Sequence, residues 1–299
     1  MPTRRTETQH RDAKGLHALA PRIALDRLLG GQLDAAAVVA SAMPAIEAAA
    51  RLAARTLEGD GRLGYAGAGS SGLMALADAL ELAGTFGIPA ERTPVLFAGG
   101  AAALLAMTGA VEDDDAAATR DLEAAGLGTG DAVIAVSASG STPYTLAIAE
   151  AARARGVAVV GIANAVGSPL LGTADVAILL DTGPELVAGS TRMCAATAQK
   201  IALNMISTLT GLLLGHVYDG YMVNVVADNA KLRDRAARIV GAVSGATEAV
   251  ARAALDSTGG AVKSAVLVAA GTDQATAESL LAASGGHIGP ALDALRSSQ

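Results

Sequence analysis

Five short apolar segments alternate along the chain with longer segments in which apolar residues recur at helical spacing. The five segments are 62–66, 94–97, 131–136, 157–162 and 176–180. Each is almost entirely apolar, which is typical of strands that are buried on both faces of a parallel sheet. Helical patterns lie between them. The sequence therefore predicts an α/β fold, a doubly wound parallel sheet with helices on both faces.

The two ends of the chain lack strand patterns. Helical spacing covers 24–57, and Pro44 is expected to divide it into two helices, because proline has no amide hydrogen to donate. Residues 246–296 contain short helical patterns separated by glycine-rich breaks. We therefore expect an N-terminal arm over 1–15, a main domain over 16–242 and a small three-helix C-terminal module over 243–299.

The composition excludes several classes of function. The chain has 299 residues, a net charge of −7, no Trp, two Phe and four Tyr. A nucleic-acid-binding protein would present a basic surface and aromatic side chains on which bases stack, and this chain offers neither. We expect no nucleic-acid partner.

The chain also has few of the cysteine and histidine residues that disulfides and metal sites require. Cys194 is the only cysteine, so no intrachain disulfide and no thiolate cluster can form, which fits a reducing cytoplasm. His216 and His287 have no partners at metal-ligand spacing, and we predict no metal and no cofactor. The polar N-terminus lacks the apolar core of a signal peptide. The apolar run 201–217 contains polar residues and is shorter than a membrane span of ~20 residues, so we expect a cytoplasmic protein without a membrane partner.

A glycine-rich loop, GAGSSG at 67–72, follows the first predicted strand. It matches the GxGxxG pattern, but a dinucleotide site would need a carboxylate at the end of the second strand, where the chain reads Ala98-Gly99-Gly100. Ser70 and Ser71 instead suit a terminal phosphate beside the free amides of a helix start. A plain helix cap would explain this loop equally well.

A second loop, 137–142, follows the third predicted strand and changes that balance. Ser137, Ser139, Ser141 and Thr142 surround a glycine, and Pro143 stands at an early helical position. A helix cap requires only one of these four hydroxyls. Ligands of such sheets bind at the carboxyl ends of the strands, where both loops lie. Together the two loops predict a phosphate site.

Three glutamates are candidates for acid–base chemistry. Glu112 begins an acidic run, 112–115, and such runs usually form a solvated face or a helix start. Glu81 lies on an otherwise apolar helix, where a carboxylate needs a partner or a wet cleft. Glu185 lies in a third loop, after the fifth predicted strand.

The order of these loops resembles the SIS (sugar isomerase) domain family, over nearly the whole chain. Within that family the chain is most similar to the branch of the N-acetylmuramic acid 6-phosphate etherases and the glucokinase regulatory proteins. The matching stretches are 67–72, 83–87, 111–114, 137–144, 167–170, 183–192, 197–208, 221–240 and, in the tail, 284–293.

The resemblance implies a carbon–oxygen lyase that needs no metal or cofactor. Etherases of this branch remove the D-lactyl ether by elimination across C2–C3 of the ring-opened sugar and then add water. The resemblance places the acid at Glu81 and the base at Glu112, whose neighbouring aspartates would raise its pKa. It implies further substrate contacts from the two serine loops, Glu185 and Ser190.

The chain departs from the family pattern at several cations. Leu73 and Ser141 stand where the family has arginines, and Cys194 replaces a lysine. The N-terminal family signature survives only as Thr6-Glu7-Thr8-Gln9-His10. If these cations hold the lactyl carboxylate in the family, their loss predicts a preference for a sugar phosphate without that carboxylate.

Two other functions stay open at this point. An aldose–ketose isomerase would use the same C2 proton abstraction, with Glu185 or Glu112 as base, and return the proton to C1. A non-catalytic sugar-phosphate sensor would regulate a partner protein. The apolar helix 192–215 and the N-terminal arm also predict a homodimer with sites near its interface. His10 could reach such a site, although a histidine in a tail is more often only solvated.

Overall fold

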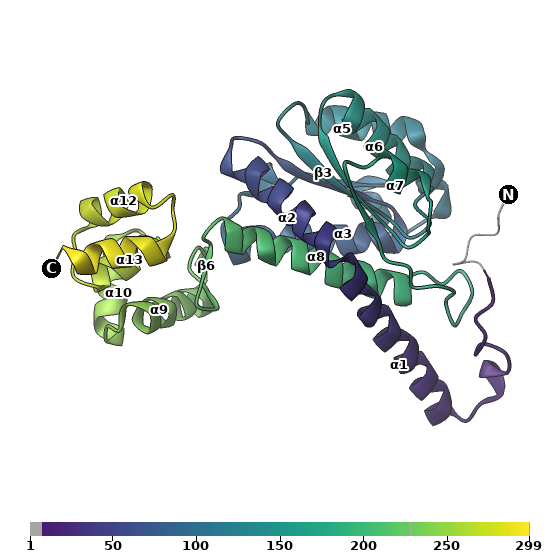
Figure 1. The fold of residues 1–299 in the computed structure, drawn as a ribbon, viewed down its shortest axis with the longest axis horizontal. Helices are drawn as coiled ribbons and strands as arrows, with labels where there is room; N and C mark the ends of the chain where they lie inside the picture. The colour runs from purple at the N-terminus through teal and green to yellow at the C-terminus, as the bar shows by residue number, and fades with distance from the viewer. Residues whose placement is uncertain (1–7, 228, 299) are drawn as a thin grey trace. The chain divides into compact units, whose positions relative to one another are not determined.

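A five-stranded parallel sheet organises the first part of the protein (Figure 1). The computed structural model describes residues 8–227 and 229–298, so Thr6 and Glu7 of the N-terminal signature lie outside the described residues. The strand order is β2-β1-β3-β4-β5, and every pairing is parallel. The bounds are β1 Leu63–Gly67, β2 Val95–Phe97, β3 Ala132–Ser137, β4 Ala158–Ala163 and β5 Val176–Leu179. Each predicted strand is confirmed to within one residue at either end.

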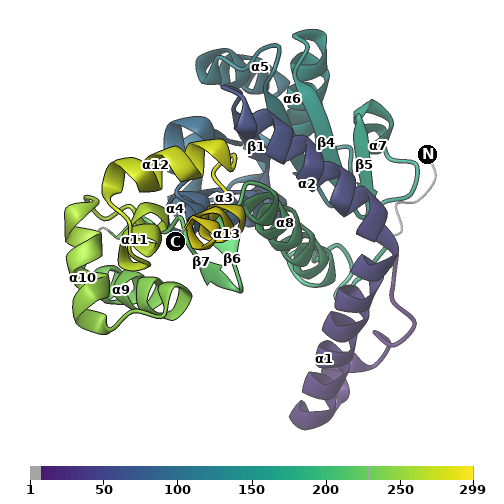
Figure 2. The same cartoon turned by 60° about the vertical axis from the view of Figure 1, so that its left-hand side comes forward.

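Helices cover both faces of this sheet, as the views in Figures 1 and 2 agree. One face carries α5 (Asp115–Ala125), α6 (Pro143–Ala154) and α7 (Pro169–Thr173), and α2 (Met43–Glu58) packs on the other. Val133 and Ala135 join the core under α5 and α6, whereas the alternate residues of β3 point to the opposite face. The predicted doubly wound α/β fold is confirmed.

A buried carboxylate ties β1 to two further helices, α3 (Gly69–Phe86) and α8 (Cys194–Leu213). Asp78 on α3 accepts hydrogen bonds from the Tyr65 hydroxyl at 3.1 Å, the Asn204 amide at 2.7 Å and the Ser207 hydroxyl at 2.9 Å. Burial raises the pKa of Asp78, and these donors act in the opposite direction. Three donors satisfy a carboxylate that would be costly to bury alone.

The N-terminal helices are α1 (Pro21–Val38) and α2, joined by the 3₁₀ turn η3 (Val39–Ala42). Pro44 stands in the first turn of α2, so the predicted break is confirmed. The stretch Pro21–Glu58 is long and apolar enough to cross a membrane, but core helices of soluble proteins pass the same test. Six residues of α2 are buried against the fold, whereas α1 buries only Ala35.

The contacts divide the chain into two units, with Leu80–Ala90 and Thr208–Gln299 forming the second. The predicted boundary at 242/243 falls inside α9, whereas this division falls at 207/208. The second unit contains a short hairpin and five complete helices. These elements are β6 Val217–Tyr218, β7 Tyr221–Met222, α9 Ala230–Ser244, α10 Glu248–Ser257, α11 Val262–Ala269, α12 Gln274–Ala283 and α13 Ile288–Ser297.

The prediction of three helices after α9 was wrong, because the structure has four. The three breaks that the sequence places in 246–296 separate four helical segments, of which the prediction counted only three. The helices share a core in which Val240, Ala251, Val266 and Leu292 are buried. No element of this core comes from the five-stranded sheet.

Candidate functional site

The first serine loop turns directly from β1 into α3. Gly69 has a φ of +53°, a left-handed conformation that favours glycine, and it is the first residue of the helix. Ser70 and Ser71 therefore lie in the first turn of α3, whose amides have no acceptor within the helix. The positive end of the helix dipole coincides with these two hydroxyls.

The second serine loop is held by its own hydroxyls. Ser137 is buried, and its Oγ lies 2.9 Å from Thr142 Oγ1 and accepts a hydrogen bond from Gly140 N at 3.0 Å. Ser139 Oγ accepts from Ser141 N at 3.2 Å and from Ser141 Oγ at 3.3 Å. Gly140 has a φ of +61°, and a Cβ there would lie 2.2 Å from Ser168 Oγ. Only glycine fits this position.

A cavity of about 490 Å³ lies between the two loops. Six of the predicted site residues line it together: Ser70, Ser71, Glu112, Ser139, Ser141 and Thr142. This volume is within the range of small-molecule sites. The remaining walls include Met107, Asp113, Gly189 and Thr191. The fold therefore brings one predicted glutamate and five predicted hydroxyl residues into the same cavity. The cavity lies at the edge of the sheet where ligands of this architecture bind.

Glu112 belongs to the 3₁₀ turn η5 (Gly109–Asp113) and approaches the first loop closely. A Cβ on Gly69 would come within 2.6 Å of Glu112 Oε1. The pKa of Glu112 is raised, first by burial and then by the negative charge of Asp113. A carboxylate with a raised pKa, next to a cradle for an anion, is suited to accept a proton from a bound substrate.

Other predicted residues have different positions. Glu185 is fully buried, and its two oxygens accept hydrogen bonds from Cys194 N at 3.0 Å and Ala195 N at 2.9 Å, so it caps the start of α8. Ser137 shapes its loop from behind the cavity wall. Ser190 is absent from the lining of the cavity, although its two neighbours are part of it.

Glu81 is exposed on α3, in the segment that belongs to the second unit. His10 Nδ1 accepts from Asp12 N at 3.0 Å, a contact within its own turn.

Met107, Gly189 and Thr191 were missed as site residues in the sequence. Met107 carries no polar group, so only the fold could place it at the cavity. Thr191 offered a signal, because it follows Ser190 in the stretch 183–192 that carries the family resemblance. A hydroxyl next to a predicted binding residue was the feature that could have identified it.

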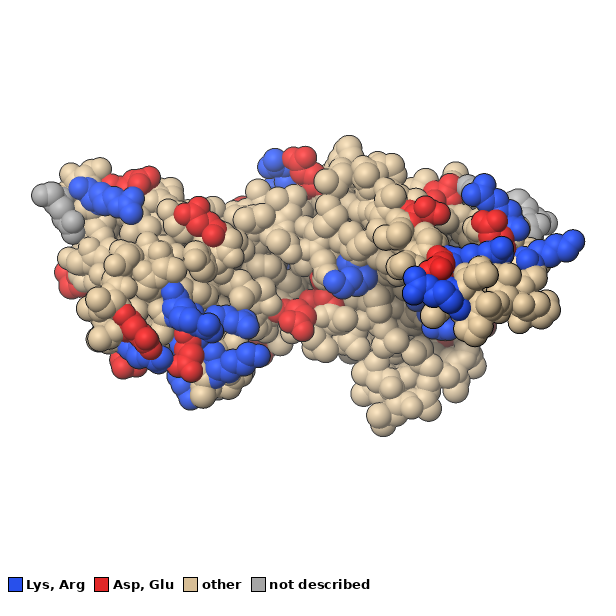
Figure 3. Space-filling view, turned by 90° about the horizontal axis from the view of Figure 1, so that it is seen from below, with Lys and Arg blue, Asp and Glu red and all other residues tan. Residues whose placement is uncertain are grey.

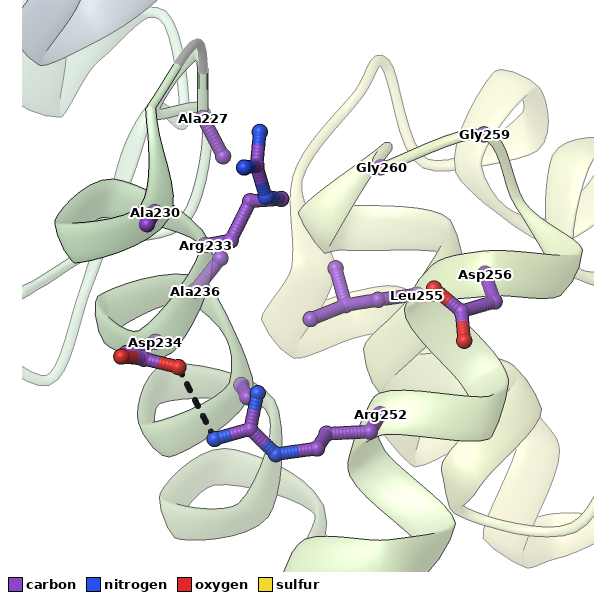
Figure 4. Close-up of a pocket in the computed structure, with 11 residues that line it drawn as sticks. Ala227, Ala230, Arg233, Asp234, Ala236, Arg252, Leu255, Asp256, Gly259 and Gly260 are labelled. Atoms are coloured by element: carbon purple, nitrogen blue, oxygen red, sulfur yellow. Dashed lines mark hydrogen bonds and ion pairs between the residues drawn. The ribbon is translucent and has the colours of Figure 1, made fainter.

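A second cavity, of about 530 Å³, lies within the helical unit (Figure 4). Its lining contains no serine or threonine, and Arg252 within it is already paired with Asp234 at 2.9 Å and with Glu248 at 2.8 Å. On the face drawn in Figure 3, basic side chains lie among acidic ones and neither sign forms a continuous field. The serine-lined cavity is therefore the better candidate for binding a phosphate.

Comparison with known proteins gives a consistent result. The model of the SIS domain family matches residues 34–164. An N-acetylmuramic acid 6-phosphate etherase of Deinococcus radiodurans is 47% identical over 95% of this chain and 93% of its own length. One from Streptomyces avermitilis is 43% identical over 92% of this chain and 89% of its own. A solved phosphoheptose isomerase from Francisella tularensis aligns with 65% of this chain and 98% of its own at 21% identity and a TM-score of 0.49.

The contact between Gly69 and Glu112 yields a prediction. Gly69→Ala would strain the left-handed turn and displace the Glu112 carboxylate, so affinity for N-acetylglucosamine 6-phosphate should fall about tenfold or more. Isothermal titration calorimetry measures this. Gly172→Ala on α7 is the matched control, because a Cβ there meets nothing within 4 Å. Unchanged affinity in Gly69→Ala would show that the first loop does not form the ligand site.

Proposed function

The chain belongs to the N-acetylmuramic acid 6-phosphate etherase family of SIS-domain proteins, and we propose that it cleaves the D-lactyl ether of that amino-sugar phosphate in the serine-lined cavity. The enzyme is a carbon–oxygen lyase. The observation that carries the proposal is that five hydroxyl residues and Glu112 line one cavity at the starts of α3 and α6.

The phosphate is bound by hydroxyls and amides. Ser70 and Ser71 donate from the first turn of α3, and Ser139, Ser141 and Thr142 donate from the loop that leads into α6. The first turns of α3 and α6 also favour an anion, because the positive ends of the helix dipoles lie there.

The reaction then requires one base and one acid. Glu112 takes the proton from C2 of the ring-opened sugar, the C3–O bond breaks, and the acid gives its proton to the departing lactate oxygen. Water adds to the resulting double bond at C3. The products are D-lactate and N-acetylglucosamine 6-phosphate. The resemblance assigns the acid role to Glu81.

The active protein is a homodimer in this proposal. Support comes from α1, where Ile23, Leu25, Leu29 and Leu33 are each at least half exposed along one short helix. Contiguous exposed apolar side chains of this kind usually mark a protein interface. A partner subunit would cover α1 and bring further residues toward the cavity. The single cysteine and the metabolic role favour the cytoplasm as its location.

The catalytic roles are tested by D-lactate release from N-acetylmuramic acid 6-phosphate. Glu112→Gln and Glu81→Gln should each lower kcat by about 10²-fold or more, because each removes a proton-transfer group, while sugar-phosphate binding is kept. Glu150→Gln, on the exposed face of α6, should keep wild-type activity. A wild-type protein that binds the substrate but releases no D-lactate would leave the isomerase or the sensor in place of the etherase.

The pH profile tests Glu112 as the base. Its raised pKa means that the rate should increase as pH rises through that pKa, because only the ionised carboxylate accepts a proton. Asp113→Asn removes the neighbouring negative charge that raises this pKa. The acid limb of the kcat/KM profile should therefore move to lower pH in Asp113→Asn. A limb that stays in place, or moves upward, would assign the titration to another group.

Sedimentation equilibrium tests the dimer. The wild type should have twice the chain mass of 29.4 kDa. Replacing Leu29 and Leu33 together by Glu places charges on the exposed face of α1 and should shift the protein to monomers. The same pair of changes at Val166 and Val250, which are also exposed, is the control. A monomeric wild type would remove the dimer from the proposal.

A further inference from the structure

Among the residues that the structure describes, no cationic side chain lines the serine-lined cavity. Its charged lining residues are Glu112 and Asp113, and no Lys or Arg is part of the wall. The substrate of the proposed function carries two separate anions, the phosphate and the lactyl carboxylate. The two serine loops provide donors for one of them. A carboxylate placed in this cavity beside two acidic side chains would be strongly disfavoured without a positive partner.

The segment between β5 and α8 provides a side chain of the required charge. Gly189 and Thr191 of this segment line the cavity, and the next residue is Arg192. Arg192 is exposed, and it makes no hydrogen bond or ion pair with any residue that the structure describes. Several other arginines of the sheet unit are paired, as Arg62 is with Asp131 at 3.1 Å and Arg155 is with Glu123 at 3.1 Å.

The backbone around Arg192 is held firmly. Glu185 caps the two amides that begin α8, two residues after the arginine. On the other side, Thr191 O accepts a hydrogen bond from Ala196 N at 3.0 Å. The base of the side chain is therefore fixed next to the cavity wall, while the guanidinium is free to turn. A long side chain with a fixed base and no partner can reach into the cavity without breaking an existing interaction.

We propose that Arg192 binds the lactyl carboxylate of the substrate and thereby selects muramic over glucosamine phosphates. This inference rests on the proposed function, because it assigns the second anion of that substrate. The planar guanidinium matches a carboxylate with two parallel hydrogen bonds. The phosphate has its own donors at the starts of α3 and α6, so the free cation goes to the other anion.

The test compares two ligands that differ only by the lactyl ether. Calorimetry in a Glu112→Gln background, in which turnover is slowed, gives the Kd of N-acetylmuramic acid 6-phosphate and of N-acetylglucosamine 6-phosphate. Arg192→Ala should raise the first Kd about 10- to 150-fold, since one charge-assisted contact is lost, and leave the second within about twofold. Arg192→Lys keeps the positive charge but not the two parallel donors of the guanidinium. Its Kd for N-acetylmuramic acid 6-phosphate should lie between those of the arginine and alanine proteins. Arg155→Ala, at the far end of α6, is the control and should change neither Kd.

Two results would overturn the inference. An equal rise of both Kd values in Arg192→Ala would assign the arginine to the phosphate. No rise in either would remove it from the site. These outcomes are separate from failure of the proposed function, because the comparison of Kd values needs no turnover. If the wild type released no D-lactate, the etherase would be excluded, while the selectivity measured by calorimetry would still decide the role of Arg192.

Discussion

Two helix starts at one edge of the sheet are the constraint on which the site depends. β1 and β3 are neighbours in the sheet, with Gly67 paired to Val136, so the loops that follow them begin side by side. Each loop leads at once into a helix, α3 or α6, whose first amides have no acceptor. These amides would be left unsatisfied inside a cavity unless an anion or water accepts from them. The strand order thus places the two helix starts of the candidate site side by side, whatever side chains they carry.

Glu112 lines the cavity in which we propose that the phosphate binds. A phosphate dianion at the helix starts would add a second negative charge near a carboxylate whose pKa is already raised by burial and by Asp113. The base should therefore hold its proton more tightly in the complex than in the free enzyme. The positive ends of α3 and α6 moderate this effect, since they face the same space. The glycine at position 69 lets the carboxylate come this close.

The sequence predicted the sheet and most of the cavity for physical reasons that can be stated. Strands such as Ala132–Ser137 are buried on both faces, so composition alone reveals them, and a serine loop after a strand can lie only at the carboxyl edge. The position of Glu185 could not be predicted in the same way. The sequence pattern around a loop glutamate is the same whether the glutamate binds substrate or caps a helix. Only the fold shows that the oxygens of Glu185 accept hydrogen bonds from Cys194 N and Ala195 N.

The hydroxyl and amide donors of the serine-lined cavity carry no formal charge, which affects how the phosphate and the lactyl carboxylate of the proposed substrate would be distinguished. Hydroxyls and amides hold a phosphate without neutralising it, because they carry no formal charge. The negative charges of a bound phosphate, Glu112 and Asp113 would then remain in the cavity and attract a nearby cation. A single arginine at the edge is therefore more effective here than it would be among several cations. If Arg192 binds the lactyl carboxylate as proposed, this chain can bind a sugar with two anions although it has Leu73 and Ser141 where the family has arginines.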